Sequence, residues 1–559
     1  MATEALPPTP LRARNFLNTR QGRVILENLT AYLFLAPAGL IIFLFALFPV
    51  GFAFFVSLHR WRRFPDDYRG LDNYYDAVGN FAYVIFFWIA LGALYFAVQS
   101  ALRLYKETKD DKRGLLFILP GLVMSGAIFA SVNWFFLLLL KILDVPQRLR
   151  GQESSTRIFV DEMLRSFRFH DVLSAANTML IAVGLTIAVL IVFMRLIKSS
   201  DRGHFLFIAT FIFTALGSSI LLMQLTMSEV NIAIDEAREA GESLGIWTNV
   251  ILISSGVLLL YLAYRLWQYT STTYEDGHFV LSGLAVILLI IGGFVLVSEL
   301  PRALSEADDD VLQGFSVTVM YAVFSVPMQL ALGLGLSILL FQNIKGKSFF
   351  RLVYFMPYIT PFVATSLVFT LIFAQREASP ANTLITFLGG DARPWLTETD
   401  GIFELITGRE LSGFLKGPSL ALFVIIIFNV WVYAGYSTVI FLAGLGNIPK
   451  ELYEAARIDG ANGWRVFRHI TFPLLSPTTF FLVLIATIGT FQAFTQIFLL
   501  RQQGAYDAVD TINLYIYQEV QNITPDYGYG SAMAFVLFAV ILLLTVFQNR
   551  LLGRKVFYG

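Results

Sequence analysis

The sequence predicts an all-α polytopic membrane protein with about twelve transmembrane helices, and three observations support this fold class. First, 56% of the 559 residues are apolar and only 14% are charged, whereas soluble domains have roughly 45–50% apolar and about 25% charged residues. Second, the apolar residues form continuous runs that are long enough to cross about 30 Å of hydrocarbon as helices. Third, these runs do not alternate with polar residues, as the strands of a membrane β-barrel would.

The residue counts exclude several other classes of protein. The chain contains no cysteine, which excludes disulfide scaffolds, cysteine-ligated metal sites and thiol nucleophiles. The 40 basic and 40 acidic residues give a formal net charge of zero, so nucleic acid is not an expected partner. The five histidines lack the spacing of metal ligands, and we expect neither a metal site nor a catalytic site.

The predicted spans follow one another along the whole chain. The first lies behind a basic segment and has no small-residue cleavage pattern after it, so we expect a retained helix and not a signal peptide. The twelve spans are 30–58, 81–102, 115–140, 173–197, 205–227, 246–267, 279–299, 312–341, 350–374, 418–445, 473–500 and 530–552.

The charges of the short loops predict the orientation, because cytoplasmic loops carry an excess of Lys and Arg. Loops expected in the cytoplasm are 103–113, 195–203 and 342–351. The acidic loops, expected outside, are 228–245 and 300–311. Two outside loops, 59–80 and 141–172, are basic and disagree with this rule; the second has apolar residues at helical spacing, which predicts a helix in the membrane interface. The even span count and the basic ends predict that both termini lie in the cytoplasm.

The most informative loop, residues 447–473, joins the tenth and eleventh spans. Pro449 can occupy the first turn of a helix, acidic Glu451 suits the positive end of the helix dipole, and Gly460 can supply the left-handed residue that ends it. A helix of about three turns is marginal alone, so it needs a surface to dock against.

One face of this short helix is predicted to approach another surface closely, because it is rich in small side chains. Glu454 offers a carboxylate to a basic residue across such a contact. The alternative is an ordinary cytoplasmic connector with small residues by chance. The residues of the face are Leu452, Ala455, Ala456 and Asp459.

The spacing of this loop resembles the coupling-loop signature of permease subunits of ATP-binding-cassette (ABC) importers. That signature reads E-A-A, three residues, G, nine residues, I-x-L-P; here it begins at Glu454 and ends at Pro473. The one departure is Phe472 in place of the usual Leu, which keeps an apolar residue. The residues that the resemblance implies in coupling to an ATPase are Glu454, Ala455, Ala456, Asp459 and Gly460.

Other segments resemble the maltose-type sugar permeases of the same family; they are 31–37, 70–74, 349–361, 441–449 and 527–532. The resemblance implies a six-helix permease core divided between residues 30–80, the first core helix and an outside segment, and residues 311–559. Residues 1–29 would be a cytoplasmic N-terminal segment. The family does not need residues 81–310, which we predict to be an inserted bundle of about six helices packed beside the core.

The resemblance also implies a non-catalytic transport subunit of a prokaryotic cell (inner) membrane, with several partners. These are a second permease subunit, two ATP-binding subunits that hold ATP and Mg²⁺, an extracytoplasmic solute-binding protein, membrane lipid and the sugar substrate. In agreement, the chain has no G-x-x-x-x-G-K-[ST] loop to bind nucleotide phosphates, so we expect no cofactor on the chain itself.

Polar and aromatic residues in the tenth and eleventh spans are candidate sugar contacts. Tyr433 and Tyr436 are three residues apart, and Gln492 and Gln496 four apart, so each pair is predicted to share one helix face. The alternative is interhelical hydrogen bonding that only holds the bundle together. The resemblance supports Tyr436 and Gln492 most directly. The full set is Asn429, Tyr433, Tyr436, Thr490, Gln492 and Gln496.

A self-sufficient secondary carrier or channel for small polar solutes is the alternative function. Ion-coupled carriers commonly place ionisable residues at membrane depth, and the core spans have almost no Asp, Glu or Lys there. The core spans also show no basic cavity for a phosphorylated substrate, which favours a neutral mono- or oligosaccharide.

Overall fold

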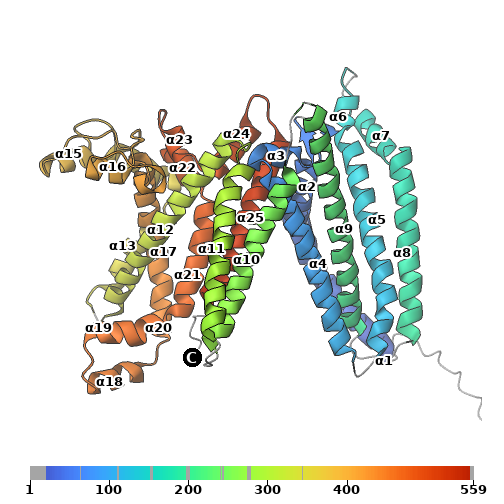
Figure 1. Ribbon diagram of the computed structural model, residues 1–559, viewed down its shortest axis with the longest axis horizontal. Coiled ribbons are helices and arrows are strands. Elements are labelled where there is room, and N and C mark those ends of the chain that lie inside the picture. Colours follow the sequence, from blue (N-terminus) through green and yellow to red (C-terminus); the bar gives the residue numbers. More distant parts are fainter. Residues whose placement is uncertain are drawn as a thin grey trace, which may run out of the picture. The chain divides into compact units, whose positions relative to one another are not determined.

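The computed structural model describes residues 20–62, 64–109, 112–151, 155–196, 202–239, 241, 245–272, 278–342 and 344–553. Most of the predicted N-terminal segment 1–29 and the end of the basic C-terminal tail therefore lie outside the described residues. The chain forms two units, Met1–Val56 and Ser57–Gly559. Almost all of the second unit is helical, which confirms the predicted all-α class (Figure 1).

The first unit is an apolar helix. It consists of α1 (Arg20–Ile42), a π-helical turn (Phe43–Leu47) and most of α2 (Phe48–Ser57). Residues Thr30–Ser57 are long and apolar enough to cross a membrane, which agrees with the first predicted span. Apolar side chains cover this segment and are exposed, as lipid contact requires.

The second unit begins with a small structure that the sequence did not predict. Strands β1 (His59–Trp61) and β2 (Pro65–Tyr68) form an antiparallel hairpin, and α3 (Asp72–Val78) follows. The buried Asn73 side chain donates hydrogen bonds to the carbonyls of Ser57 (2.8 Å) and His59 (3.0 Å). Because α3 also packs on α4, α12 and α25, it joins helices from distant parts of the sequence.

The described residues between 81 and 303 form six long α-helices and two short ones. Their bounds are α4 (Phe81–Glu107), α5 (Ile118–Leu143), α6 (Val145–Arg148), α7 (Thr156–Ser166), α8 (His170–Leu196), α9 (Arg202–Glu239), α10 (Ile246–Thr272) and α11 (His278–Ala303). Helix α4 packs on α9, α5 packs on α8 and α9, and α10 packs on α11 (Figure 1). Small residues permit the close approach: an added Cβ on Gly121 of α5 would lie 2.6 Å from the Cβ of Ala209 on α9.

Ion pairs are present in both of the basic loops that depart from the charge rule. Lys141 lies 3.2 Å from Asp171, and Arg165 lies 2.6 Å from Glu162, within and beside α7. In the loop 59–80, Arg69 lies 3.4 Å from Asp76. Local acidic partners thus lie beside some of the basic side chains in each loop. Helix α7 itself is the helix predicted in loop 141–172.

The remaining residues form the predicted core. The long helices are α12 (Asp309–Phe341), α17 (Leu420–Gly446), α21 (Ser476–Phe491) and α25 (Tyr527–Leu551). The shorter ones are α13 (Lys347–Ile359), α14 (Phe362–Ile372), α15 (Pro380–Phe387), α16 (Ile402–Thr407), α18 (Lys450–Ile458), α19 (Gly463–Val466), α20 (Phe472–Leu474), α22 (Thr495–Leu500), α23 (Tyr506–Val509) and α24 (Ile512–Gln521). Helix α17 is the most buried and packs on α12, α13 and α21.

Two predicted spans are broken and not continuous. The ninth consists of α13 and α14, which meet at an angle of 95°, and the eleventh is bent by 64° between α20 and α21. Ten helices within the described ranges satisfy the length and hydropathy of a membrane span, and the two bent pairs bring the number to twelve. The predicted number of spans therefore holds, although the straight course of these two does not.

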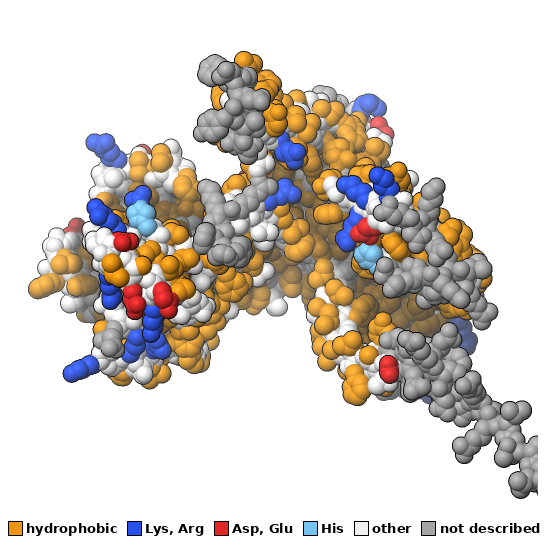
Figure 2. Space-filling model, turned by 90° about the horizontal axis from the view of Figure 1, so that it is seen from below, with side chains coloured by type: hydrophobic (Ala, Val, Ile, Leu, Met, Phe, Trp, Pro, Cys, Tyr) orange, Lys and Arg blue, Asp and Glu red, His pale blue; other side chains and the backbone are white. Residues whose placement is uncertain are grey.

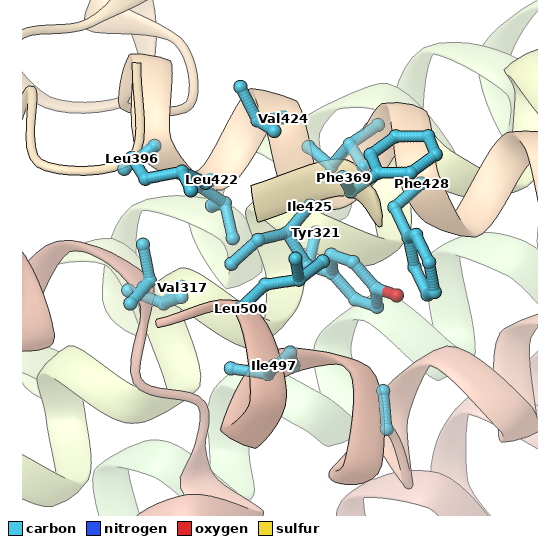
Figure 3. Close-up of a cluster of buried hydrophobic side chains, with 14 of the residues drawn as sticks. Val317, Tyr321, Phe369, Leu396, Leu422, Val424, Ile425, Phe428, Ile497 and Leu500 are labelled. Atoms are coloured by element: carbon cyan, nitrogen blue, oxygen red, sulfur yellow. The ribbon is translucent and has the colours of Figure 1, made fainter. Parts of the chain in front are cut away.

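A dense apolar cluster fills the core on the side of α16 and α23 (Figure 3). Tyr321 of α12 and Phe428 of α17 are fully buried in it, together with Ile497 of α22. Phe369 of α14 packs edge-on against Phe428 with ring centroids 5.0 Å apart. This cluster, which also includes Val317, Leu422, Ile425 and Leu500, is called the apolar plug below.

Candidate substrate cavity and coupling helix

Helix α18 forms where the sequence predicts a short helix, and local signals set both of its ends. Pro449 is the residue directly before the helix and Glu451 lies in its first turn. At the other end Gly460 has φ +71°. Its amide donates to the carbonyl of Arg457 (3.1 Å), and the amide of Ala461 donates to that of Ala456 (2.9 Å). This pair of bonds is the Schellman ending, in which glycine is strongly favoured.

One residue of the predicted small-residue face of α18 is buried in the structure, and the others are exposed. Ala456 is buried against its own chain, beside Tyr453, whose hydroxyl lies 3.3 Å from that of Thr471. The other predicted coupling residues, Glu454, Ala455, Asp459 and Gly460, are exposed, as is Leu452 of the same predicted face. Ala456 and Tyr453 therefore anchor α18, while the opposite side of the helix is free to meet a partner.

Charged side chains surround α18. The exposed basic residues of α18 and the following turn are Lys450, Arg457, Arg465 and Arg468, and the acidic ones are Glu451, Glu454 and Asp459. Figure 2 shows these two kinds of side chain gathered on the face seen from below, at the left, with apolar groups between them. The exposed apolar side chains include Ile458 (87%) and Trp464 (65%). A mixed polar and apolar surface of this kind suits a protein partner.

A cavity of about 140 Å³ lies between α12, α13, α17 and α21; it is called the tyrosine cavity below. Its polar lining residues are Gln329, Tyr358, Asn429, Tyr433, Tyr436, Ser437 and Thr490. Its other walls are Leu482, Ile485, Ala486 and Gly489. The structure thus brings together four of the six residues predicted for a substrate pathway, and none of the lining residues is charged.

Three tyrosines form one wall of this cavity. The ring of Tyr358 stacks on that of Tyr436 with centroids 5.0 Å apart and packs edge-on against Tyr433 at 5.8 Å. Tyr433 and Tyr436 therefore share a helix face, as predicted from their spacing. Tyr358, which the sequence analysis missed, comes from α13, just before the break between α13 and α14.

A chain of side-chain amides crosses the bundle beside the tyrosine cavity. The amide of Asn429 donates to Gln329 (3.3 Å), and that of Gln496 donates to the hydroxyl of Tyr321 (3.1 Å). Gln496 also lies 3.5 Å from the side-chain oxygen of Asn429. All four side chains are buried. Gln496 is therefore in the interior as predicted, but it reaches the cavity only through Asn429.

Gln492 differs from the prediction. Helix α21 ends at Phe491 and α22 begins at Thr495, so Gln492 and Gln496 do not share a helix face. Gln492 is exposed and does not line the tyrosine cavity. The two glutamines separate because Phe494, with φ −137° and ψ −61°, interrupts the helix between them.

The fold and these two features, an uncharged cavity within the bundle and an exposed short helix at one end, define a membrane transport subunit. No group of three or more His, Asp or Glu residues that could hold a metal ion is present within the ranges that the structure describes. The sequence profile of the binding-protein-dependent transport system inner membrane components matches residues 329–558. The chain belongs to this family of ABC importer permeases, whose members are non-catalytic subunits.

Several known proteins are similar to this chain. The arabinooligosaccharide transport system permease AraP of Bacillus subtilis is 32% identical over 240 residues, which are 43% of this chain and 69% of that protein. The sn-glycerol-3-phosphate permease UgpA of Agrobacterium fabrum is 29% identical over 294 residues, which are 52% of this chain and 88% of that protein. A solved bacterial ABC transporter that imports the acidic polysaccharide alginate aligns with 44% of this chain and 80% of its own, with 22% identity and a TM-score of 0.37. The family profile and the permeases AraP and UgpA confirm the predicted resemblance to sugar permeases.

Proposed function

We propose that this chain is the membrane-spanning subunit of an ABC importer that moves a neutral carbohydrate into the cytoplasm. The observation that carries the proposal is the tyrosine cavity. Aromatic faces and uncharged groups that both donate and accept hydrogen bonds suit the hydroxyls and C–H faces of a sugar ring. The names of relatives that transport arabinooligosaccharides, lactose and trehalose or maltose support the same substrate class.

The proposal assigns substrate contact to Tyr358, Asn429, Tyr433, Tyr436 and Thr490, and leaves Gln496 as support for Asn429. Gln492, which the sequence analysis included, has no role in it. The cavity is smaller than the roughly 300–1,000 Å³ of common ligand pockets. It must therefore enlarge to admit a whole sugar, as a cavity that alternates between two conformations would.

The second part of the proposal concerns the supply of energy. A pair of ATP-binding subunits would dock on the exposed side of α18 in the cytoplasm, and their closure would move α18 as a rigid body. A second permease subunit and an extracytoplasmic solute-binding protein would complete the importer. This assignment places both termini in the cytoplasm and the α15–α16 end outside. It also makes residues 81–310 an insertion, which agrees with a family profile that matches only within 311–559.

Uptake by reconstituted vesicles tests the substrate assignment. The importer complex, purified through a tag on this chain, is tested with its solute-binding protein and labelled arabinotriose, maltose or glycerol 3-phosphate. We expect ATP-dependent uptake of a neutral sugar, and Tyr436→Leu should raise the half-saturating sugar concentration at least tenfold. Tyr261→Leu, at a half-exposed tyrosine of α10, is the matched control. Uptake of glycerol 3-phosphate alone would refute the neutral substrate.

The coupling role has its own test. A double variant, Glu454→Ala with Gly460→Ala, should assemble normally but lose sugar-stimulated ATPase activity, whereas Glu410→Ala at the opposite end should keep it. Normal stimulation in the double variant would contradict the role of α18. Sugar flux through vesicles that contain this chain alone, without nucleotide, would instead support the carrier or channel.

A further inference from the structure

A second, larger pocket lies on the other side of the apolar plug. Its volume is about 520 Å³, against about 140 Å³ for the tyrosine cavity. It is called the outer pocket below, because the proposed orientation places this end of the bundle outside. Of these two pockets, the outer pocket lies in the range of about 300–1,000 Å³ that is typical of ligand sites, and the tyrosine cavity lies below it.

Three segments that are far apart in the sequence form the walls of the outer pocket. One wall is the first part of α12, with Gln313, Ser316, Val317 and Met320. The second is the segment before α17 together with the first turn of α17, with Thr399, Gly413, Phe414, Lys416, Gly417, Pro418, Ser419 and Leu422. The third is the turn that contains Gly504, Ala505, Asp507 and Ala508.

Hydrogen bonds tie these walls to one another, so the pocket is formed in advance of any ligand. The Gln313 side-chain amide donates to the carbonyl of Asp507 (2.9 Å), which joins the first wall to the third. The Ser419 hydroxyl donates to the carbonyl of Ala508 (3.1 Å), which joins the second to the third. Preorganised walls lower the entropic cost of binding a ligand.

The second wall is also braced internally. The Glu404 carboxylate accepts hydrogen bonds from the amides of Gly401 and Leu411, both at 3.0 Å, and lies 3.4 Å from the ammonium of Lys416. The backbone of the loop pairs with the start of α17, where Leu420 donates to Asp400 (3.0 Å). These contacts fix the position of Phe414, whose ring is 54% exposed at the pocket.

The chemistry of the lining indicates the class of ligand. Phe414 offers an aromatic face, Val317, Met320 and Leu422 form an apolar base, and the hydroxyls of Ser316 and Thr399 can donate and accept hydrogen bonds. The ammonium of Lys416 lies beside the Glu404 carboxylate, and the charged residue that the lining adds to this pair is Asp507. An aromatic platform with uncharged polar groups at its edge fits a glycosyl unit.

The outer pocket lies in line with the tyrosine cavity. Leu422 lines the former and Asn429 the latter, and these residues are seven apart on α17, or about 10 Å along the helix. Between them lie Ile425 and Phe428 of the apolar plug, and Val317 and Leu422 belong both to the plug and to the outer pocket (Figure 3). Movement of the plug would connect the two pockets.

We propose that the outer pocket is a second carbohydrate-binding site, which holds a neutral glycosyl unit outside the apolar plug before the unit passes to the tyrosine cavity. The proposal rests on the proposed import of sugar, but it assigns a separate site with its own residues. Phe414 is its stacking platform, and Ser316 and Thr399 are its hydrogen-bonding groups.

The absence of cysteine from the chain permits a direct test, because a single introduced thiol reports on one position only. Ser316→Cys places the thiol in the outer pocket, and Ser305→Cys places one on an exposed loop that does not line the pocket. The full chain in lipid nanodiscs is labelled with a maleimide in the presence of arabinotriose, maltose or trehalose. A saturating concentration of one of these sugars should lower the rate of maleimide labelling of Ser316→Cys at least fivefold. The labelling rate of Ser305→Cys should stay unchanged.

A second substitution makes the test specific. Phe414→Ala in the Ser316→Cys background should raise at least tenfold the sugar concentration that gives half-maximal protection from labelling. Phe387→Ala, at a phenylalanine of α15 that is 84% exposed, should leave this concentration unchanged. Uptake of sugar by the complex without protection of Ser316→Cys would overturn the outer site and leave the proposed function standing. Absence of any sugar uptake would overturn the proposed function itself. Protection by the solute-binding protein without sugar would show that the pocket receives a protein loop and would also overturn the proposal.

Discussion

The contact between α13 and α17 gives a prediction whose size follows from the structure. A Cβ added at Gly435 would lie 1.9 Å from the carbonyl oxygen of Tyr354 and 3.2 Å from the Cα of Phe355. A carbon–oxygen contact requires about 3.3 Å, so Gly435→Ala must separate the two helices by about 1.4 Å. The obstacle is backbone, which no rotamer change can relieve. Overpacking of this kind costs about 1–3 kcal/mol.

Gly335 of α12 provides the matched control, because a Cβ added there meets nothing within 4 Å. Gly335→Ala should be neutral or stabilise the helix by about 0.5–1 kcal/mol. Thermal unfolding of the detergent-solubilised chain, followed by tryptophan fluorescence, should give a midpoint for Gly435→Ala that is lower by several degrees than that of Gly335→Ala.

The same substitution should disturb the tyrosine cavity. Tyr358 follows Tyr354 by one helical turn on α13, so a displaced α13 carries its ring away from Tyr433 and Tyr436. Sugar affinity should fall together with the unfolding midpoint. Equal midpoints for Gly435→Ala and Gly335→Ala would refute the close approach of α13 and α17, and with it the wall of three tyrosines.

Two further predictions concern the buried amides and the wall of the outer pocket. Gln496→Leu removes the hydrogen bonds from Gln496 to the hydroxyl of Tyr321 and to the side-chain oxygen of Asn429, and should destabilise the chain by about 1–3 kcal/mol. The exposed Gln492→Leu should not; equal unfolding midpoints would contradict the amide chain. The amides of Leu411 and Gly401 donate hydrogen bonds to Glu404 and hold the pKa of its carboxyl below the usual value. The ionised carboxylate therefore stabilises the fold fully above about pH 4.3, the ordinary pKa of Glu. This stabilisation is lost as the pH falls through the lower pKa of the folded state. Glu404→Gln should therefore flatten the acid side of the stability profile, and the exposed Glu410→Gln should leave it unchanged; a profile unaltered by Glu404→Gln would contradict the brace.

The course of the spans could be predicted as far as hydrophobic length determines it. The break in the ninth span had a local signal, because Thr360 precedes Pro361 and a residue before proline avoids the helical region. The gap after α21 had no such signal. There the carbonyls of Phe491 and Ala493 accept hydrogen bonds from the side chains of Asn513 (2.8 Å) and Thr511 (3.5 Å). Only tertiary structure supplies those partners, which backbone groups need at membrane depth.

The residues of the candidate site also fall into those that the sequence predicts and those that depend on tertiary structure. Tyr433 and Tyr436 were predicted because both lie on one helix, where spacing determines the shared face. Tyr358 and Gln329 were missed because they come from α13 and α12, and no local pattern shows that these helices meet α17. The ends of α18 were predictable from Pro449 and Gly460, whereas the burial of Ala456 depends on the segment that follows.

The junction around α3 has a consequence for the synthesis of the chain. The start of α25 packs directly on β1, where a Cβ on Gly528 would lie 2.2 Å from the carbonyl oxygen of His59. At about 5–20 residues per second, the ribosome needs roughly half a minute or more to make the intervening residues. During that time α4 to α11 enter the membrane while the hairpin and α3 wait for α12 and α25. Helices α4 to α11 are therefore complete before α12 and α25 are made, and a truncated chain that ends at residue 310 should already resist proteolysis in membranes.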